Sequence, residues 1–174
     1  MKNAYLKPQD IVVLFRILTW TGEDWSYERL SEALGMSASH VYYAIQRAQF
    51  SRLYDAERGR IRRHELREFL TCGIRYAFAV HPGTSERGIP TAHSADWAEE
   101  YFAAAGGENY VWPHPGGAHR GLAVRPLYKT VPEVVMDAPE LHDLLAIVDT
   151  LRLGSSRERG VAAQALDSHL GIEK

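Results

Sequence analysis

Residues 27–48 read YERLSEALGMSASHVYYAIQRA and give the clearest indication of structure in the N-terminal part of the chain. Ser26 precedes it with a hydroxyl group that suits the N-cap of a helix. Gly35 ends that helix, because glycine adopts the left-handed conformation without a Cβ penalty. Ser37 supplies the cap of a second helix that runs to about Ala48. The pattern therefore predicts two short helices joined by a tight turn.

Further elements are predicted on both sides of this pair. A helix is expected from about Pro8 to Trp20, where apolar residues recur three and four positions apart. After the pair, Phe50–Tyr54 and Arg60–Arg62 are predicted as short strands on either side of a turn at Asp55–Gly59. A last helix is expected over Arg63–Tyr76, again from apolar residues on one face.

This order of elements over residues 6–76 resembles the winged helix-turn-helix of bacterial regulators of the MarR and related kinds. In that motif a small residue lies where the two helices touch, a glycine breaks the first helix, and a β-branched residue anchors the second. Ser31, Gly35 and Val41 fill these positions here, although the family more often has alanine in place of Ser31. The resemblance implies a protein that binds duplex DNA and regulates transcription.

The second helix of the pair is expected to present a polar face. If Val41, Ile45 and Ala48 face the core, the opposite side carries hydroxyl groups, an amide and a cation, which suit phosphates and base edges. Arg58 and Arg60, at the tip of the hairpin, are expected to contact the DNA backbone or the minor groove. The candidate DNA-binding residues of the helix are Ser37, Ala38, Ser39, Tyr42, Tyr43, Gln46 and Arg47. Both tyrosines are equally suited to half-buried packing.

The charge of the chain is divided unevenly. Residues 1–76 carry 12 Lys and Arg against 9 Asp and Glu, whereas residues 77–174 carry 8 against 13. Within residues 47–63 there are 6 arginines and 2 acidic residues. A basic patch on an otherwise acidic chain is typical of a module that binds a polyanion beside a module with another role.

Length and composition restrict the class of protein. The chain has 174 residues, of which 45% are hydrophobic and 24% charged, as in a soluble globular protein. Its longest apolar run, Ile11–Phe15, is far shorter than the roughly 18 residues that span a bilayer. Cys72 is the single cysteine, so an internal disulfide and a multi-cysteine metal site are excluded. We therefore expect a cytoplasmic protein that does not enter the membrane.

Residues 77–136 are rich in glycine, proline and aromatic residues and show little periodicity. A helix is expected over Asp96–Ala105 and a strand over Gly121–Tyr128. The aromatic content argues against disorder and favours an ordered sensor or partner-binding region. Arginines here suit an anionic ligand or a partner carboxylate, and ordinary ion pairs explain them equally well. The candidates are Arg87, Arg120 and Arg125.

The same region contains four histidines, but their spacing does not fit a metal site. No pair has the separation that fixes ligands on one helix or in one tight loop. No phosphate loop, dinucleotide fingerprint or nucleophile elbow is present in the sequence. We therefore expect no metal, no cofactor and no enzymatic activity, with a small metal-assisted enzyme as a less favoured alternative. The histidines are His81, His93, His114 and His119, with Asp96 and Glu99 as the nearest candidate carboxylates.

Residues 137–174 are predicted to form a pair of helices. Asp137 with Glu140, and Ser155 with Glu158, have the spacing of capping boxes. The first helix carries more apolar surface than a short surface helix needs. This stripe suits either the core of the monomer or the seam of a dimer, and the seam is favoured. Its residues are Leu141, Leu144, Leu145, Val148 and Leu151.

Taken together, these patterns predict a mainly α fold with a small β hairpin, in three regions. Residues 1–76 form the winged helix-turn-helix domain, residues 77–136 the mixed sensor or partner region, and residues 137–174 the helical dimerisation region. The predicted function is a sequence-specific transcriptional regulator that binds double-stranded DNA as a homodimer on a pseudo-palindromic site. A second protein is a further candidate partner. The alternative is an adaptor that keeps the winged-helix fold without binding DNA, which the acidic C-terminal half favours.

Overall fold

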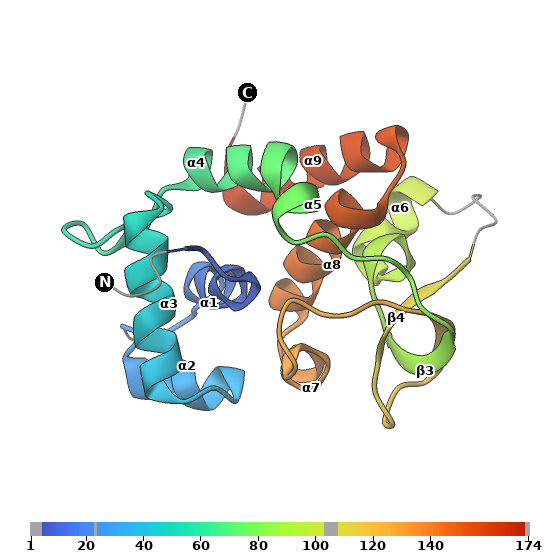
Figure 1. Cartoon of the computed structure of the whole chain (residues 1–174), viewed down its shortest axis with the longest axis horizontal. Helices are drawn as coiled ribbons and strands as arrows, with labels where there is room; N and C mark the ends of the chain where they lie inside the picture. The colour runs from blue at the N-terminus through green and yellow to red at the C-terminus, as the bar shows by residue number, and fades with distance from the viewer. Residues whose placement is uncertain (1–4, 23, 103–107, 173–174) are drawn as a thin grey trace.

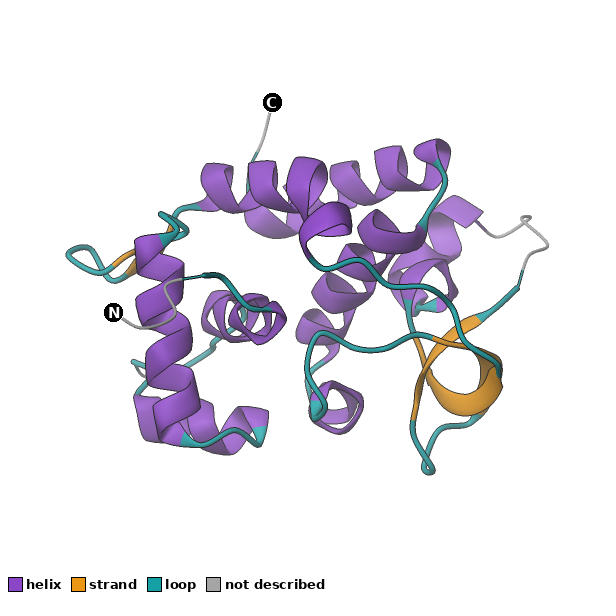
Figure 2. Ribbon diagram, viewed as in Figure 1, coloured by secondary structure: helices purple, strands orange, loops and turns teal. Residues whose placement is uncertain are grey.

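The fold is mainly helical with small β elements, as predicted (Figure 1; Figure 2). The computed structural model describes residues 5–22, 24–102 and 108–172. In this part of the chain, no helix is long and apolar enough to cross a membrane. The helices are α1 (Pro8–Leu18), α2 (Tyr27–Leu34), α3 (Ala38–Phe50), α4 (Arg63–Glu68), α5 (Ile74–Ala77), α6 (Glu99–Phe102), α7 (Val131–Val134), α8 (Pro139–Leu153) and α9 (Ser156–Leu170). The strands are β1 (Tyr54–Asp55), β2 (Arg60–Ile61), β3 (Ser85–Pro90), β4 (Tyr110–Pro113) and β5 (His119–Ala123).

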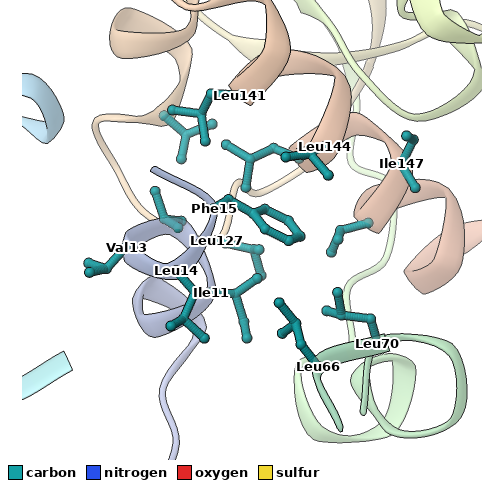
Figure 3. Close-up of a cluster of buried hydrophobic side chains, with 14 of the residues drawn as sticks. Ile11, Val13, Leu14, Phe15, Leu66, Leu70, Leu127, Leu141, Leu144 and Ile147 are labelled. Atoms are coloured by element: carbon teal, nitrogen blue, oxygen red, sulfur yellow. The ribbon is translucent and has the colours of Figure 1, made fainter. Parts of the chain in front are cut away.

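Helix α1 lies at the centre of the molecule, between α3 and α8 (Figure 1). Its five consecutive apolar residues Ile11–Phe15 have no exposed surface, which is expected only of a helix covered on every side. Figure 3 shows Leu141 and Leu144 of α8 beside Phe15. The buried cluster around α1 is continuous and draws residues from all three predicted regions.

The caps of the helix pair follow the predicted pattern. The Ser26 hydroxyl accepts a hydrogen bond from the backbone N–H of Arg29 (3.2 Å), and the Ser37 hydroxyl accepts one from that of His40 (3.3 Å). Gly35 ends α2 in the left-handed conformation, with φ of 56°. The two helices and the tight turn between them are confirmed.

A two-stranded hairpin follows α3, but it is shorter than predicted. Helix α3 continues to Phe50, so the expected strand over Phe50–Tyr54 is wrong. β1 and β2 pair antiparallel, with Tyr54 opposite Ile61, and Gly59 turns the chain with φ of 61°. The predicted last helix is continuous in space but contains a π-helical turn over Phe69–Gly73 between α4 and α5.

The middle region contains a three-stranded sheet in which each strand pairs with both others. β3 is antiparallel to β4 and to β5, whereas β4 and β5 run parallel. Such close packing needs glycine, because a Cβ at Gly88, Gly117 or Gly121 would overlap the backbone of a neighbouring segment. The predicted strand Gly121–Tyr128 is placed wrongly, because β5 covers His119–Ala123.

The predicted helix Asp96–Ala105 is divided between two elements. A 3-10 turn covers Asp96–Ala98 and is followed directly by α6. The end of the prediction, residues 103–105, lies outside the described residues.

A buried carboxylate fastens the middle region to α8. Asp149 accepts hydrogen bonds from the Thr91 hydroxyl (2.9 Å), the Trp112 indole (2.7 Å) and the Arg152 guanidinium (2.6 Å). Burial raises the pKa of Asp149, and these donors oppose the shift. Arg152 also donates to the carbonyl of Phe78 (2.8 Å), which ties the segment after α5 to the same point.

The apolar stripe of α8 is covered within the chain. Each of its five predicted residues is at most 2% exposed, because α1, α5 and α9 pack around the helix. The expectation that this stripe forms a dimer seam is therefore wrong, and the alternative of a monomer core is confirmed. The capping box of Ser155 and Glu158 is confirmed. The N-cap of α8 is Ala138, which has no side-chain cap, so the predicted box of Asp137 and Glu140 is wrong.

Candidate nucleic-acid interface

The start of α3 presents an exposed polar surface. Ser37, Ala38 and Ser39 are exposed, and the two serine hydroxyls lie 3.1 Å apart. One turn further, Tyr42 is 45% and Tyr43 56% exposed. The exposure predicted for Ala38, Ser39, Tyr42 and Tyr43 is confirmed.

Arg47 does not belong to this surface. It is only 7% exposed, and its Nε and Nη2 atoms donate to the two carboxylate oxygens of Asp10 on α1 (2.8 and 2.5 Å). Burial raises the pKa of Asp10, and the hydrogen bonds from Arg47 and from the Lys7 backbone oppose that shift. The prediction that Arg47 is exposed to DNA is therefore wrong, and Gln46 beside it is half-buried rather than exposed.

Ser31 lies where α2 meets the turn before α3, and its hydroxyl group has a structural role. Its hydroxyl donates to the carbonyl of Met36 (2.5 Å), within the turn between α2 and α3. The serine therefore satisfies a backbone acceptor in the turn, which alanine cannot do.

The hairpin carries the exposed cations of the interface. Arg58 and Arg60 are exposed as predicted, but Arg58 donates to Asp55 (3.1 Å). Arg60 pairs with Asp55 through its backbone in the β1–β2 ladder, but its side chain has no hydrogen bond or ion pair with any described residue. Hydrogen bonds from the backbone and side chain of Arg58 hold the pKa of Asp55 below its usual value.

Arg52 is a further cation that the sequence-based selection missed. It follows α3 directly, is exposed, and adopts a φ of 61°, which is uncommon for a residue with a side chain. Its side chain is likewise unpaired within the described part of the chain. In the sequence, only the excess of arginines over residues 47–63 indicated that Arg52 belongs to a basic surface.

A cleft of about 630 Å³ opens beneath the hairpin. It lies between the hairpin, the start of α4 and the end of α9, and Arg63 donates to the carbonyl of Leu170 (2.7 Å) at this junction. Four arginines and a histidine outnumber two acidic residues on its walls. Its charged lining residues are Asp55, Arg58, Arg60, Arg62, Arg63, His64 and Glu65.

A chain of aromatic rings crosses from α2 onto α3. The ring centroids are 5.7 Å apart for Trp25 and Tyr27, 5.7 Å for Tyr27 and Tyr42, and 5.4 Å for Tyr42 and Tyr43. Phe50, at the other end of α3, is 63% exposed. Exposed aromatic side chains are also typical of protein interfaces.

The structure brings two of the three candidate arginines of the middle region together. Arg87 on β3 lies directly opposite Arg120 on β5, and neither has an ion pair with a described residue. Arg125 lies apart from them, in another cleft. The explanation by ordinary ion pairs therefore does not apply to this pair within the described residues.

The histidines of the middle region are separated. In residues 5–22, 24–102 and 108–172, no three His, Cys, Asp or Glu side chains are placed to hold a metal ion. His93 instead lies 3.1 Å from a carboxylate oxygen of Glu158, the residue that completes the capping box of α9.

No protein-family model, curated protein or solved structure matches this chain. The likeness to winged helix-turn-helix regulators therefore depends on the residues 27–48 and on the order of the elements around them.

Proposed function

We propose that this protein binds double-stranded DNA, with α3 in the major groove and the β1–β2 hairpin against the sugar-phosphate backbone. The observation that carries the proposal is the placement of exposed polar groups at both ends of one helix. Serine hydroxyls lie at the start of α3, and unpaired arginines follow its end.

The start of α3 suits a phosphate or a base edge. The free backbone N–H groups of the first turn and the helix dipole favour negative charge there. Ser37 and Ser39 add hydroxyl groups, which bind phosphates as well as bases. Tyr42 and Tyr43 extend the contact surface by one turn along the helix.

The hairpin supplies the electrostatic part of binding. Helix α3 has 13 residues and is therefore about 20 Å long, which separates the arginines from the serines. Arg52 and Arg60 are the best candidates for phosphate contacts, because neither is engaged by a described acidic residue. Arg58 would have to leave Asp55 to make the same contact.

The wider proposal is a transcriptional regulator. A homodimer would place two α3 helices about 34 Å apart on a pseudo-palindromic site. Because α8 is covered within the chain, such a dimer would use another surface. The number of protein chains bound to a duplex with a single site distinguishes a monomer from a homodimer.

The test measures the affinity for the duplex upstream of the protein's own gene and for a shuffled duplex, at several salt concentrations. We expect preference for the native duplex and a linear fall of log affinity with log salt. The double variant Arg52→Gln with Arg60→Gln should lower the salt slope by about 1.8. The matched control is Arg87→Gln with Arg120→Gln, which removes the same charge elsewhere and should leave the slope unchanged.

Two results would contradict this proposal. One is failure of the folded protein to bind either duplex at low salt. The other is an equal loss of affinity in both double variants, which would indicate a response to net charge instead of a contact.

A second candidate function is an adaptor that binds another protein through the same face. The aromatic chain from Trp25 to Tyr43 and the exposed Phe50 favour it. Its test is the variant Tyr43→Ser, which should weaken a complex with a protein partner, while the folded unmodified protein binds no duplex at low salt.

A further inference from the structure

A cleft of about 930 Å³ lies away from the hairpin, where three segments of the chain meet. One wall is the start of α1 at Pro8 and Gln9. The second is the segment after α5, from Phe78 to Gly83, and the third is the segment between β5 and α7. Its volume falls within the range of about 300–1,000 Å³ that small-molecule sites occupy.

The charges that line this cleft are positive. Arg125 and Lys129 are exposed on its third wall, and no acidic residue is among the described residues that line it. The electrostatic environment therefore favours an anion.

Arg152 is a buried residue at the same cleft, and Asp149 balances its charge. Its side chain is 5% exposed; Nη1 binds Asp149 and Nε binds the carbonyl of Phe78. Its second terminal nitrogen, Nη2, has no hydrogen-bond partner within the described residues. A guanidinium with an unused donor at the wall of a cleft suits a carboxylate or sulfonate oxygen.

The other residues that line the cleft are apolar, apart from Gln9 and His81. Phe78, Leu127 and Tyr128 line the cleft together with four prolines. An apolar surface with a few convergent cations is the usual form of a site for an organic acid. We infer that this cleft binds a small organic anion, a carboxylate or sulfonate that carries an aliphatic or aromatic body. The prolines are Pro8, Pro113, Pro126 and Pro132.

One wall of the cleft is fastened to the helix pair. Thr130 follows Lys129, and its hydroxyl donates to the carbonyl of Leu34 at the end of α2 (2.7 Å). Its methyl group faces Gly35, where an added Cβ would lie only 3.3 Å away. If a bound anion shifts Lys129, the neighbouring Thr130 transmits the shift to the turn that positions α3. This link to DNA binding rests on the proposed function.

The first experiment uses anilinonaphthalene sulfonate as a fluorescent probe on the full chain, without DNA. We expect saturable binding that octanoate displaces and octanol, of the same chain length, does not. The variant Arg125→Gln with Lys129→Gln should weaken probe binding at least about tenfold. The control Arg87→Gln with Arg120→Gln loses the same charge outside the cleft and should bind the probe normally. Thermal melts confirm that both variants are folded.

The inference is overturned if the probe does not saturate, if octanol displaces it as well as octanoate does, or if both double variants bind alike. A second experiment tests the link to α3. Octanoate should change duplex affinity about fivefold or more in the unmodified protein. In Thr130→Val, which lacks the bond to Leu34, the change should vanish while the probe still binds.

The two proposals fail separately. If the probe binds as expected but no duplex does, the cleft remains an anion site and DNA binding is wrong. If duplex binds and the probe does not, the cleft inference is wrong and DNA binding is unaffected. If both bind but octanoate leaves duplex affinity unchanged, the link through Thr130 is wrong.

Discussion

Arg47 on α3 and Asp10 on α1 form a bidentate ion pair in which both side chains are buried. The pair joins the helix proposed to read DNA to the central helix of the molecule. The backbone N–H of Lys7 donates to the same carboxylate (2.8 Å), so the pair also fixes the start of α1. The cation of α3 is therefore part of the packing between the two helices.

Removal of one partner is expected to destabilise the fold. Arg47→Met leaves Asp10 buried without its cation, which costs about 3–5 kcal/mol in the free energy of unfolding. Urea denaturation measures this loss. The double variant Asp10→Leu with Arg47→Met should lose less than Arg47→Met alone, because no buried charge is left unpaired. If the double variant lost as much stability as the two single variants together, the unpaired buried charge would not be the cause.

Asp55 is expected to make the hairpin sensitive to acid. Hydrogen bonds from Arg58 lower the pKa of Asp55, so the folded state favours its carboxylate form. The stabilisation is therefore complete above the ordinary pKa of about 4 and is lost as the pH falls through the lowered value. In thermal melts, the difference between the unmodified protein and Asp55→Asn should be constant from about pH 5 to 7 and shrink below about pH 4. Glu57→Gln, an equal change of charge in the same turn, should melt close to the unmodified protein.

The indole of Trp112 is expected to matter through its N–H group. Trp112→Phe keeps most of the apolar ring but leaves the buried Asp149 without one donor, at a cost of about 1–3 kcal/mol. Chemical denaturation measures the loss. The matched control is Trp97→Phe, where a half-buried indole donates to the carbonyl of Ala92, and it should cost less. Equal losses would show that the Asp149 network adds nothing specific.

The opposed arginines of the small sheet are expected to repel each other. Arg120→Thr should stabilise the fold by about 0.2–1 kcal/mol at low salt, because it removes a like charge directly opposite Arg87. The gain should disappear as added salt screens exposed charges. Arg125→Thr serves as the control, because Arg125 lies outside the strands and has no arginine paired opposite it. A gain that persists at high salt would point to strand propensity instead of charge.

Local chemistry explains which parts of the fold were predictable. Ser26, Gly35 and Ser37 act within three or four residues of their own positions, so their role can be inferred from the sequence alone. Arg47 could not be placed in this way. Its partner Asp10 lies 37 residues earlier, and a polar residue at a helix boundary is assigned to solvent unless that partner is known.

Long-range packing decided the remaining errors. The strands of the middle sheet are short and held together by close contacts at Gly88, Gly117 and Gly121. Their sequences therefore lack the alternation of polar and apolar residues from which a strand is predicted. Helix α8 is apolar enough for either a dimer seam or a core. Only the position of α1 beside it distinguishes the two.

The central position of α1 means that the helices proposed to read DNA are not a detachable unit. A fragment that ends at residue 76 keeps α1, α2, α3 and the hairpin but lacks α8, which covers Phe15. Such a fragment would expose side chains that are wholly enclosed in the intact chain, and aggregation would follow. A destabilising substitution within α8 is therefore expected to disturb the packing of α1, and through α1 that of α3.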